Sequence, residues 1–140
     1  MEVKELQDQE ELTAGYRVMR QLRDHLSLGQ FLALYEAMQD KGYRLFGLVD
    51  GGEIVAVAGV FVTTNLIDGR HVWVDDLVTD ERLRSRGYGQ ALLSFVHEYA
   101  RQQGCSLVGL ASGVQREDAH RFYEQKIGYV RTAYDYKKSV

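Results

Sequence analysis

The stretch RLRSRGYGQALL, residues 82–93, carries three arginines on alternate positions, then two glycines one residue apart, then an apolar run. A strand that turns directly into a helix exposes the first unpaired N–H groups of that helix. These donors and the positive end of the helix dipole favour an anion, and glycine lets a phosphate approach the backbone closely. We therefore predict a phosphate-binding turn; a tight turn with solvated arginines is the alternative interpretation.

The predicted turn uses backbone amides, with arginine side chains adding positive charge around them. Known nucleotide motifs fit poorly, because no Gly-Lys-Ser/Thr follows and Ala91 and Leu92 stand where a dinucleotide-binding pattern has its third glycine. The amides come from Ser85, Arg86, Gly87, Tyr88, Gly89 and Gln90, and the charges from Arg82, Arg84 and Arg86.

Composition indicates a globular protein that is neither strongly basic nor membrane-spanning. The chain has 140 residues, is 45% hydrophobic and carries a net charge of −3, which favours one domain over residues 1–140 and argues against a nucleic-acid partner. Its single cysteine, Cys105, excludes an intramolecular disulfide. Residues 1–12 lack a signal peptide, and the longest apolar run, residues 54–62, is too short to cross a bilayer. We expect a cytoplasmic protein with no membrane partner.

Apolar spacing predicts a mixed sheet with helices on both faces, an α/β (α+β) fold. Asp50-Gly51-Gly52 is a turn signature that joins two of the strands into a hairpin. Ser27 is the expected N-cap of the second helix. The expected helices lie at 12–22, 28–38, 88–103 and between the Ser112-Gly113 loop and Gly128, and the expected strands at 43–49, 53–64, 70–79, 105–111 and 129–136.

Three segments together resemble the GNAT acetyltransferase superfamily. RSRGYG, residues 84–89, matches the Q/R-x-x-G-x-G/A signature, and WVDDLVT (73–79) and AHRFYEQKIGY (119–129) resemble the flanking motifs. The resemblance implies a mostly antiparallel central sheet, acetyl-CoA as co-substrate and a pantetheine arm that pairs with a strand end. The cofactor-binding residues it implies are Leu77, Val78, Thr79, Arg84, Ser85, Arg86, Gly87, Tyr88, Gly89, Gln90, Ala119 and Tyr123.

Tyr123 falls where this family often has a tyrosine that protonates the departing thiolate of CoA. A phenol of pKa ~10 is a suitable donor for that step. The alternative is a core tyrosine, because Ala119 and Phe122 complete an ordinary packing stripe with it.

Asp75 and Asp76 are the candidate general bases. An alkyl ammonium of pKa ~10.4 must lose a proton before it attacks a thioester. In polyamine-acetylating relatives a base, usually glutamate, stands nine positions before the signature, which is Asp75 here. On a regular strand the two side chains point to opposite faces, so only one is expected to face the substrate. A strand bulge would exchange them, and capping or pairing is the alternative role for Asp76.

Four other residues are weaker candidates. Arg116 stands where many relatives have asparagine, so a polar contact to the cofactor arm is in doubt there. His120 neighbours Tyr123 and could relay protons, and His71 and Trp73 could line the substrate side; packing or surface roles are the alternatives. The histidines show no metal-ligand spacing, and we predict no metal.

The resemblance implies an N-acetyltransferase that holds acetyl-CoA and a primary amine of a small molecule or peptide together and transfers the acetyl group by direct attack. The main alternative is a non-catalytic acyl-CoA-binding sensor or interaction module of the same fold. Family habit favours a homodimer.

Overall fold

The computed structural model describes residues 1–140, which form two compact units, Met1–Gly109 and Leu110–Val140. The chain contains β1 (Glu2–Glu5), α1 (Gln9–Met19), α2 (Leu28–Gln39), β2 (Arg44–Asp50), β3 (Glu53–Asn65), β4 (Gly69–Thr79), η1 (Glu81–Leu83), α3 (Tyr88–Gln102), β5 (Val108–Leu110), α4 (Glu117–Arg121) and η2 (Phe122–Lys126).

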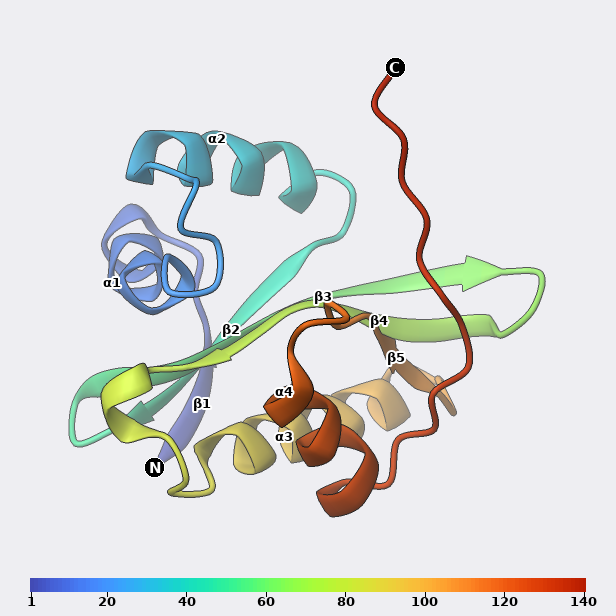
Figure 1. Cartoon of the computed structure of the whole chain (residues 1–140). Coiled ribbons are helices and arrows are strands. Elements are labelled where there is room, and N and C mark those ends of the chain that lie inside the picture. The colour runs from blue at the N-terminus through green and yellow to red at the C-terminus, as the bar shows by residue number, and fades with distance from the viewer. The chain divides into compact units, whose positions relative to one another are not determined.

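The strands form one sheet in the order β1-β2-β3-β4-β5. The β1–β2, β2–β3 and β3–β4 pairings are antiparallel. At the β2–β3 turn Gly51 and Gly52 have φ of 60° and 79°, which only glycine adopts readily, and this confirms the predicted hairpin. The β3–β4 hairpin continues beyond Arg44↔Val60, the last β2–β3 pair, as a two-stranded arm (Figure 1).

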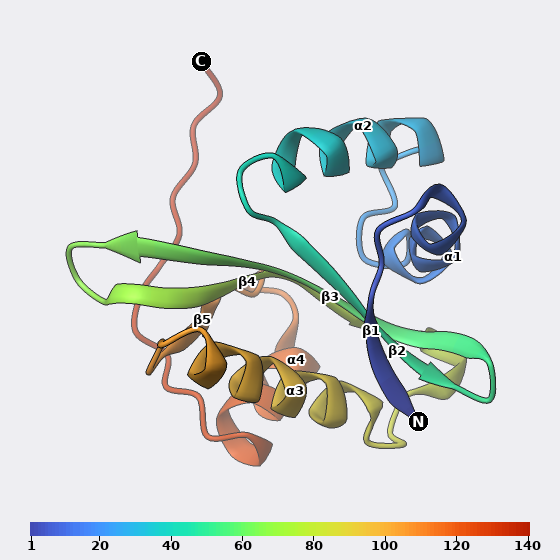
Figure 2. The ribbon, with the colours of Figure 1, turned by 180° about the vertical axis from the view of Figure 1, so that it is seen from behind.

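Helices cover both faces of the sheet in the first unit, as predicted. α1 and α2 lie on one face and α3 on the other (Figures 1 and 2). Gly15 of α1 sits against Leu6, Leu45 and Val57, and the close approach leaves no room for a larger side chain because its Cβ would lie 2.7 Å from Leu6 Cδ1. On the opposite face, Phe46 packs its ring against two aromatic rings of α3, Phe95 and Tyr99, at 5.1 and 5.2 Å.

Local capping explains where α1 and α2 begin. The side chains of Asp8 and Ser27 each accept a hydrogen bond from the backbone amide three residues later. The side chains of Glu11 and Gln30 in turn accept a hydrogen bond from the backbone N–H of the cap residue. Such reciprocal caps satisfy helix amides that otherwise have no partner. Ser27 is therefore the N-cap that the sequence predicts.

Three predicted elements need correction, and one strand was not predicted. The strand expected at 129–136 is wrong: residues 127–140 contain no helix or strand, since an alternating pattern forms a strand only when a neighbour pairs with it. β1 was not expected, because Glu2–Glu5 has a single apolar residue, Val3. The strand expected at 105–111 is limited to Val108–Leu110, and the helix expected between the Ser112-Gly113 loop and Gly128 is α4 followed by the π-helical η2.

Candidate active site

The predicted phosphate turn leads into α3 through two left-handed residues. Ser85 and Gly87 have φ of 64° and 83°, and Gly87 is the helix N-cap without a side-chain bond to the first turn. The amides of Tyr88, Gly89 and Gln90 are the first of the helix and have no carbonyl one turn earlier to receive them. Unpaired amides and the helix dipole make this end of α3 suited to an anion.

A tyrosine fixes the start of α3. The Tyr88 hydroxyl donates to Asp50 Oδ2 at 2.5 Å, which ties the helix to the end of β2. This bond raises the pKa of Tyr88. The side chain is therefore a structural anchor, and the backbone amide of the same residue stays available to a ligand.

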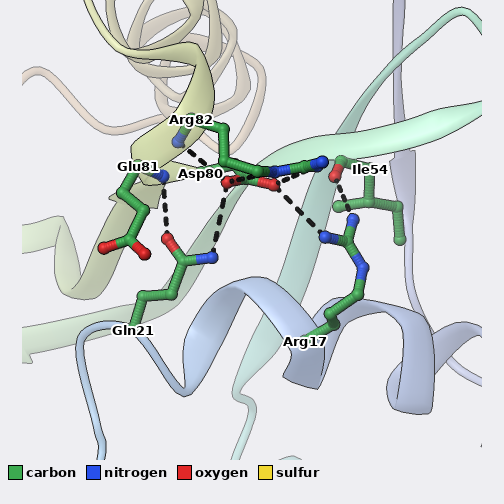
Figure 3. A network of polar contacts seen from close by, with 6 residues as sticks. All are labelled: Arg17, Gln21, Ile54, Asp80, Glu81 and Arg82. Atoms are coloured by element: carbon green, nitrogen blue, oxygen red, sulfur yellow. Dashed lines mark hydrogen bonds and ion pairs between the residues drawn. The ribbon is translucent and has the colours of Figure 1, made fainter.

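Asp80 anchors the other end of the turn in a polar network (Figure 3). Its fully buried carboxylate accepts from Arg82 Nη2 at 2.8 Å and Arg17 Nη1 at 3.2 Å. Gln21 reaches Asp80 Oδ1 at 3.5 Å and accepts from the amide of Glu81 at 2.8 Å. The Arg82 guanidinium, opposed by burial and helped by Arg17, holds the pKa of Asp80 far below its usual range. The network ties the segment after β4 to α1.

The three arginines of the turn differ in their pairing. The Arg82 guanidinium is bound to Asp80, and 61% of the Arg82 side chain is exposed. Arg84 and Arg86 are exposed beside the turn. That all three add positive charge around a phosphate stays a prediction.

A β-bulge lies at the two candidate bases. Gly59 of β3 pairs with Asp76, and the next residue, Val60, pairs with Val74, so Asp75 is the extra residue of β4. A bulge interrupts the alternation of side chains. The expectation that the aspartates face opposite sides was made for a regular strand, and β4 is not regular at this point. The Asp76 carboxylate and the Arg23 guanidinium both act electrostatically on Asp75.

The carboxylate of Asp76 is fully engaged. Arg23 Nε donates to Oδ1 at 3.0 Å, and the Tyr43 hydroxyl donates to Oδ2 at 2.6 Å. Tyr43 reaches Asp76 by passing over Gly59, where a Cβ would lie 1.6 Å from the Tyr43 hydroxyl. Gly59 is therefore required for close approach, a recurrent reason for glycine inside a strand.

The side-chain carboxylate of Asp75 makes no hydrogen bond or ion pair within the chain. Arg23 Nη2 donates at 2.9 Å to the backbone oxygen of Asp75, not to its side chain. Burial raises the pKa of Asp75 above its ordinary value, the Asp76 carboxylate adds to this, and Arg23 opposes both. A half-buried, unpaired carboxylate with a raised pKa is a group that a cationic ligand or a proton would satisfy.

The end of β4 provides a free backbone edge within the first unit. Leu77 and Val78 pair with Ala58 and Val57 of β3 on one side. On the other side, the amide of Val72 donates to Leu107 immediately before β5, and β5 has only three residues. β5 therefore accompanies the start of β4 and leaves Leu77–Thr79 without a second strand neighbour. Such an edge can pair with an extended ligand.

The second unit contains Tyr123, at the second position of the π-helical η2. Its ring is buried and lies 5.4 Å from Phe122 and 5.9 Å from Tyr129. Burial raises the pKa of Tyr123, and Arg116 partly opposes this. The phenol is therefore protonated at neutral pH and can donate. Ala119, half-buried, lies on α4.

Each of the two weaker histidine candidates has a ring nitrogen within hydrogen-bond distance of a backbone carbonyl. His120 Nε2 lies 2.8 Å from the carbonyl of Gly113, and His71 Nδ1 lies 2.8 Å from that of Gly69. His71 is buried. These contacts favour the packing and turn roles over proton relay. No group of three or more acidic, histidine or cysteine side chains is arranged to hold a metal ion, and no helix is both long and apolar enough to span a membrane.

Sequence reasoning missed the residues that hold the β4 bulge and the segment after β4 in place. Arg23, Tyr43 and Asp80 gave no motif, and only the tertiary contacts identify them. Two signals were present: a glycine in the middle of an apolar strand, Gly59, and an aspartate directly after one, Asp80. Each is a residue type that a strand end or interior rarely holds without a specific reason.

Comparison with known proteins places this geometry in a family. The model of the acetyltransferase (GNAT) family matches residues 7–129. The chain is 39% identical over 139 residues to the uncharacterized N-acetyltransferase YhdJ of Bacillus subtilis (strain 168), covering 99% of this chain and 98% of that protein. It is 30% identical over 99 residues to the aminoalkylphosphonate N-acetyltransferase of Salmonella typhimurium, covering 70% of this chain and 62% of the relative.

A solved structure shares the fold. An aminoglycoside N-acetyltransferase in complex with CoA superposes with a TM-score of 0.84 at 16% identity, covering 99% of this chain and 95% of that one. At that identity the likeness concerns the fold alone. The family model and the relatives identify an N-acetyltransferase. The chain belongs to the GNAT acetyltransferase family.

Proposed function

We propose that the protein transfers the acetyl group of acetyl-CoA to a primary amine that is bound at the same time. The observation that carries the proposal is the unpaired Asp75 carboxylate at the β4 bulge, close in the chain to the free strand edge and followed by the unpaired amides of α3. The carboxylate would act as the base, the strand edge would pair with the pantetheine arm, and the amides would bind the diphosphate.

The groups at the start of α3 and at the end of β4 are chemically suited to bind acetyl-CoA. The α3 amides from Tyr88 to Gln90, with Ser85–Gly87 before them, would bind the diphosphate. The Leu77–Thr79 edge would pair with the amide groups of the pantetheine arm, and a backbone N–H near Val78 would bind the thioester oxygen. Arg84 and Arg86 would add charge near the phosphates. A Cβ at Gly87 would meet nothing within 4 Å, so glycine serves the left-handed backbone there.

The proposed transfer balances in protons and bonds. Asp75, directly or through water, takes one proton from the acceptor's ammonium, and the free amine attacks the thioester carbon. A C–N bond forms, the C–S bond breaks, and the CoA thiolate takes a proton from Tyr123. The attacking nitrogen loses its second proton, which restores the phenol of Tyr123, and Asp75 releases its proton to solvent. The products are an N-acetylated amine, CoA thiol and one net proton.

A cationic acceptor agrees with the charges at the bulge. Asp75 and Asp76 carry two negative charges, and Arg23 supplies one positive charge. One ammonium group of the acceptor would bring the net charge of this cluster to zero. Two relatives are named for N-acetylation of amine-bearing small molecules, an aminoalkylphosphonate and an aminoglycoside, and a small primary amine is the acceptor class that we propose.

The test is acetyl transfer to an amine panel, followed by thiol release, together with calorimetry of acetyl-CoA binding. We expect binding of acetyl-CoA and turnover that depends on the amine. Tyr123→Phe should lower kcat with little change in the Kd of acetyl-CoA, because the phenol acts on the leaving group. Binding without turnover for every amine would instead favour a non-catalytic acyl-CoA-binding module, and no binding would refute both.

A further inference from the structure

Arg23 holds both residues of the bulge but pairs with only one carboxylate. Its Nε donates to Asp76 Oδ1 at 3.0 Å, and its Nη2 donates to the backbone oxygen of Asp75 at 2.9 Å. Arg23 lies in the connection between α1 and α2, 53 residues before Asp76. Both of these hydrogen bonds of the guanidinium therefore go to groups other than the carboxylate of Asp75.

Tyr43 fixes the remaining oxygen of Asp76. Its ring is buried and packs at 6.2 Å from Tyr35 and 5.2 Å from Phe61, and Gly59 leaves the space that the hydroxyl occupies. Burial, then the Asp76 carboxylate, raises the pKa of Tyr43, so it remains a donor at neutral pH. Both oxygens of Asp76 therefore have a donor within the chain, so any rotation of this carboxylate would break these bonds.

We propose that Arg23 and Asp76, braced by Tyr43, are positioning residues that leave the Asp75 carboxylate unpaired for the ammonium group of the acceptor. The inference rests on the proposed function. Asp76 serves as the counter-ion of Arg23, and without it the guanidinium would be the nearest cation for Asp75. Asp76 is then not an alternative base but the residue that keeps Asp75 free.

The two members of the pair act on Asp75 with opposite sign. The groups that face Asp75 are Asp76 on its own strand, Arg23 from the α1–α2 connection and Tyr43, which precedes β2. The Asp76 charge raises the pKa of Asp75 and the Arg23 charge lowers it. Removing one or the other must therefore shift the titration of Asp75 in opposite directions.

The experiment is a carboxyl ¹³C NMR titration of Asp75 in the full chain, without ligand. Arg23→Gln should move the midpoint to higher pH. Asp76→Asn should move it to lower pH, because it removes a like charge and releases Arg23 to pair with Asp75. The double variant should return close to the wild type. Arg20→Gln, an exposed arginine three residues before Arg23, is the matched charge control and should leave the midpoint unchanged.

A kinetic readout separates positioning from simple stability. The acidic limb of kcat/KM against pH should move in the same direction as the NMR midpoint in each variant, with the double variant restoring it. Shifts in the same direction for both single variants, or no shift in either, would overturn the proposal, as would NMR shifts that the kinetic limb does not follow. Absence of acetyl transfer by the wild type would refute the proposed function instead, and the NMR titration would still decide whether the pair controls Asp75.

Discussion

Two carboxylates five positions apart at the end of one strand have opposite environments. Asp80 is fully buried and surrounded by donors from Arg17, Gln21 and Arg82, and its pKa is lowered. Asp75 is half-buried without a side-chain partner, and its pKa is raised. Burial with partners stabilises the charge and fixes the backbone; burial without them leaves a group whose charge a ligand can complete.

The comparison separates a carboxylate that stabilises the fold from one that is available for binding and catalysis. Asp80 ties the segment before α3 to α1, so it acts on the shape of the predicted phosphate turn. Asp75 contributes nothing comparable to the packing of the strand, and its value lies in what it can bind. The predictions below test this division, beginning with the largest effect.

Asp75→Asn should lower kcat/KM about a hundredfold, the lower end of the range for losing a general base. The melting temperature should stay the same or rise, because the variant removes an unpaired, half-buried charge. Steady-state thiol release and a thermal scan measure the two effects. Asp68→Asn, an exposed aspartate in the β3–β4 turn, is the control. An unchanged kcat/KM would remove Asp75 from the mechanism.

Asp80→Asn should reduce the free energy of unfolding by about 2 kcal/mol, because bonds to a buried charge are lost while the donors remain. It should also raise the Kd of acetyl-CoA, since the turn before α3 loses its anchor to α1. Denaturant unfolding and calorimetry check both. Glu98→Gln breaks an exposed pair with Arg101 and should change little. A stability equal to the wild type would contradict the structural role.

Tyr43→Phe should reduce the free energy of unfolding by about 1 kcal/mol through the lost bond to Asp76. Tyr35→Phe is the matched comparison, because its hydroxyl donates to the neutral carbonyl of Leu6 at 3.3 Å, against 2.6 Å to a carboxylate for Tyr43. The Tyr43 variant should be the more destabilised of the two. The reverse order in denaturant unfolding would show that Tyr43 does not hold Asp76 as the structure indicates.

The pH dependence of stability should distinguish the two aspartates by sign. Asp80 has a lowered pKa in the folded state, so its contribution is complete above the ordinary aspartate pKa of about 3.9 and declines as the pH falls below it. Asp75 has a raised pKa, so its ionised form destabilises the fold above that raised value and has no effect below the ordinary one.

Unfolding free energies of Asp80→Asn and Asp75→Asn, measured from neutral to acidic pH, check these signs. At neutral pH the first variant should be less stable than the wild type and the second at least as stable. The Asp75→Asn difference should disappear as the pH falls to the ordinary aspartate value, and the Asp80→Asn difference should shrink only below that value. Differences of the same sign at neutral pH would break the comparison.

Local sequence signals predicted most of the elements and the position of the turn that leads into α3. The Gly51–Gly52 hairpin, the Ser27 cap and the helix after Gly87 each depend on the conformational preference of one or two residues. Where a partner far along the chain was needed, prediction failed: β1 forms because it pairs with β2, and residues 129–136 do not form a strand. The predicted single domain, homodimer and cytoplasmic location remain predictions.

By itself the sequence determined that an amide-rich turn precedes an amphipathic helix and that two aspartates end the apolar part of a strand, because these depend on neighbours a few residues away. Only the tertiary structure decided which aspartate is free. That choice requires a bulge opposite Gly59, a guanidinium 53 residues away and a phenol 33 residues away. Charge pairing in a folded chain depends on distance in space, which local sequence does not encode.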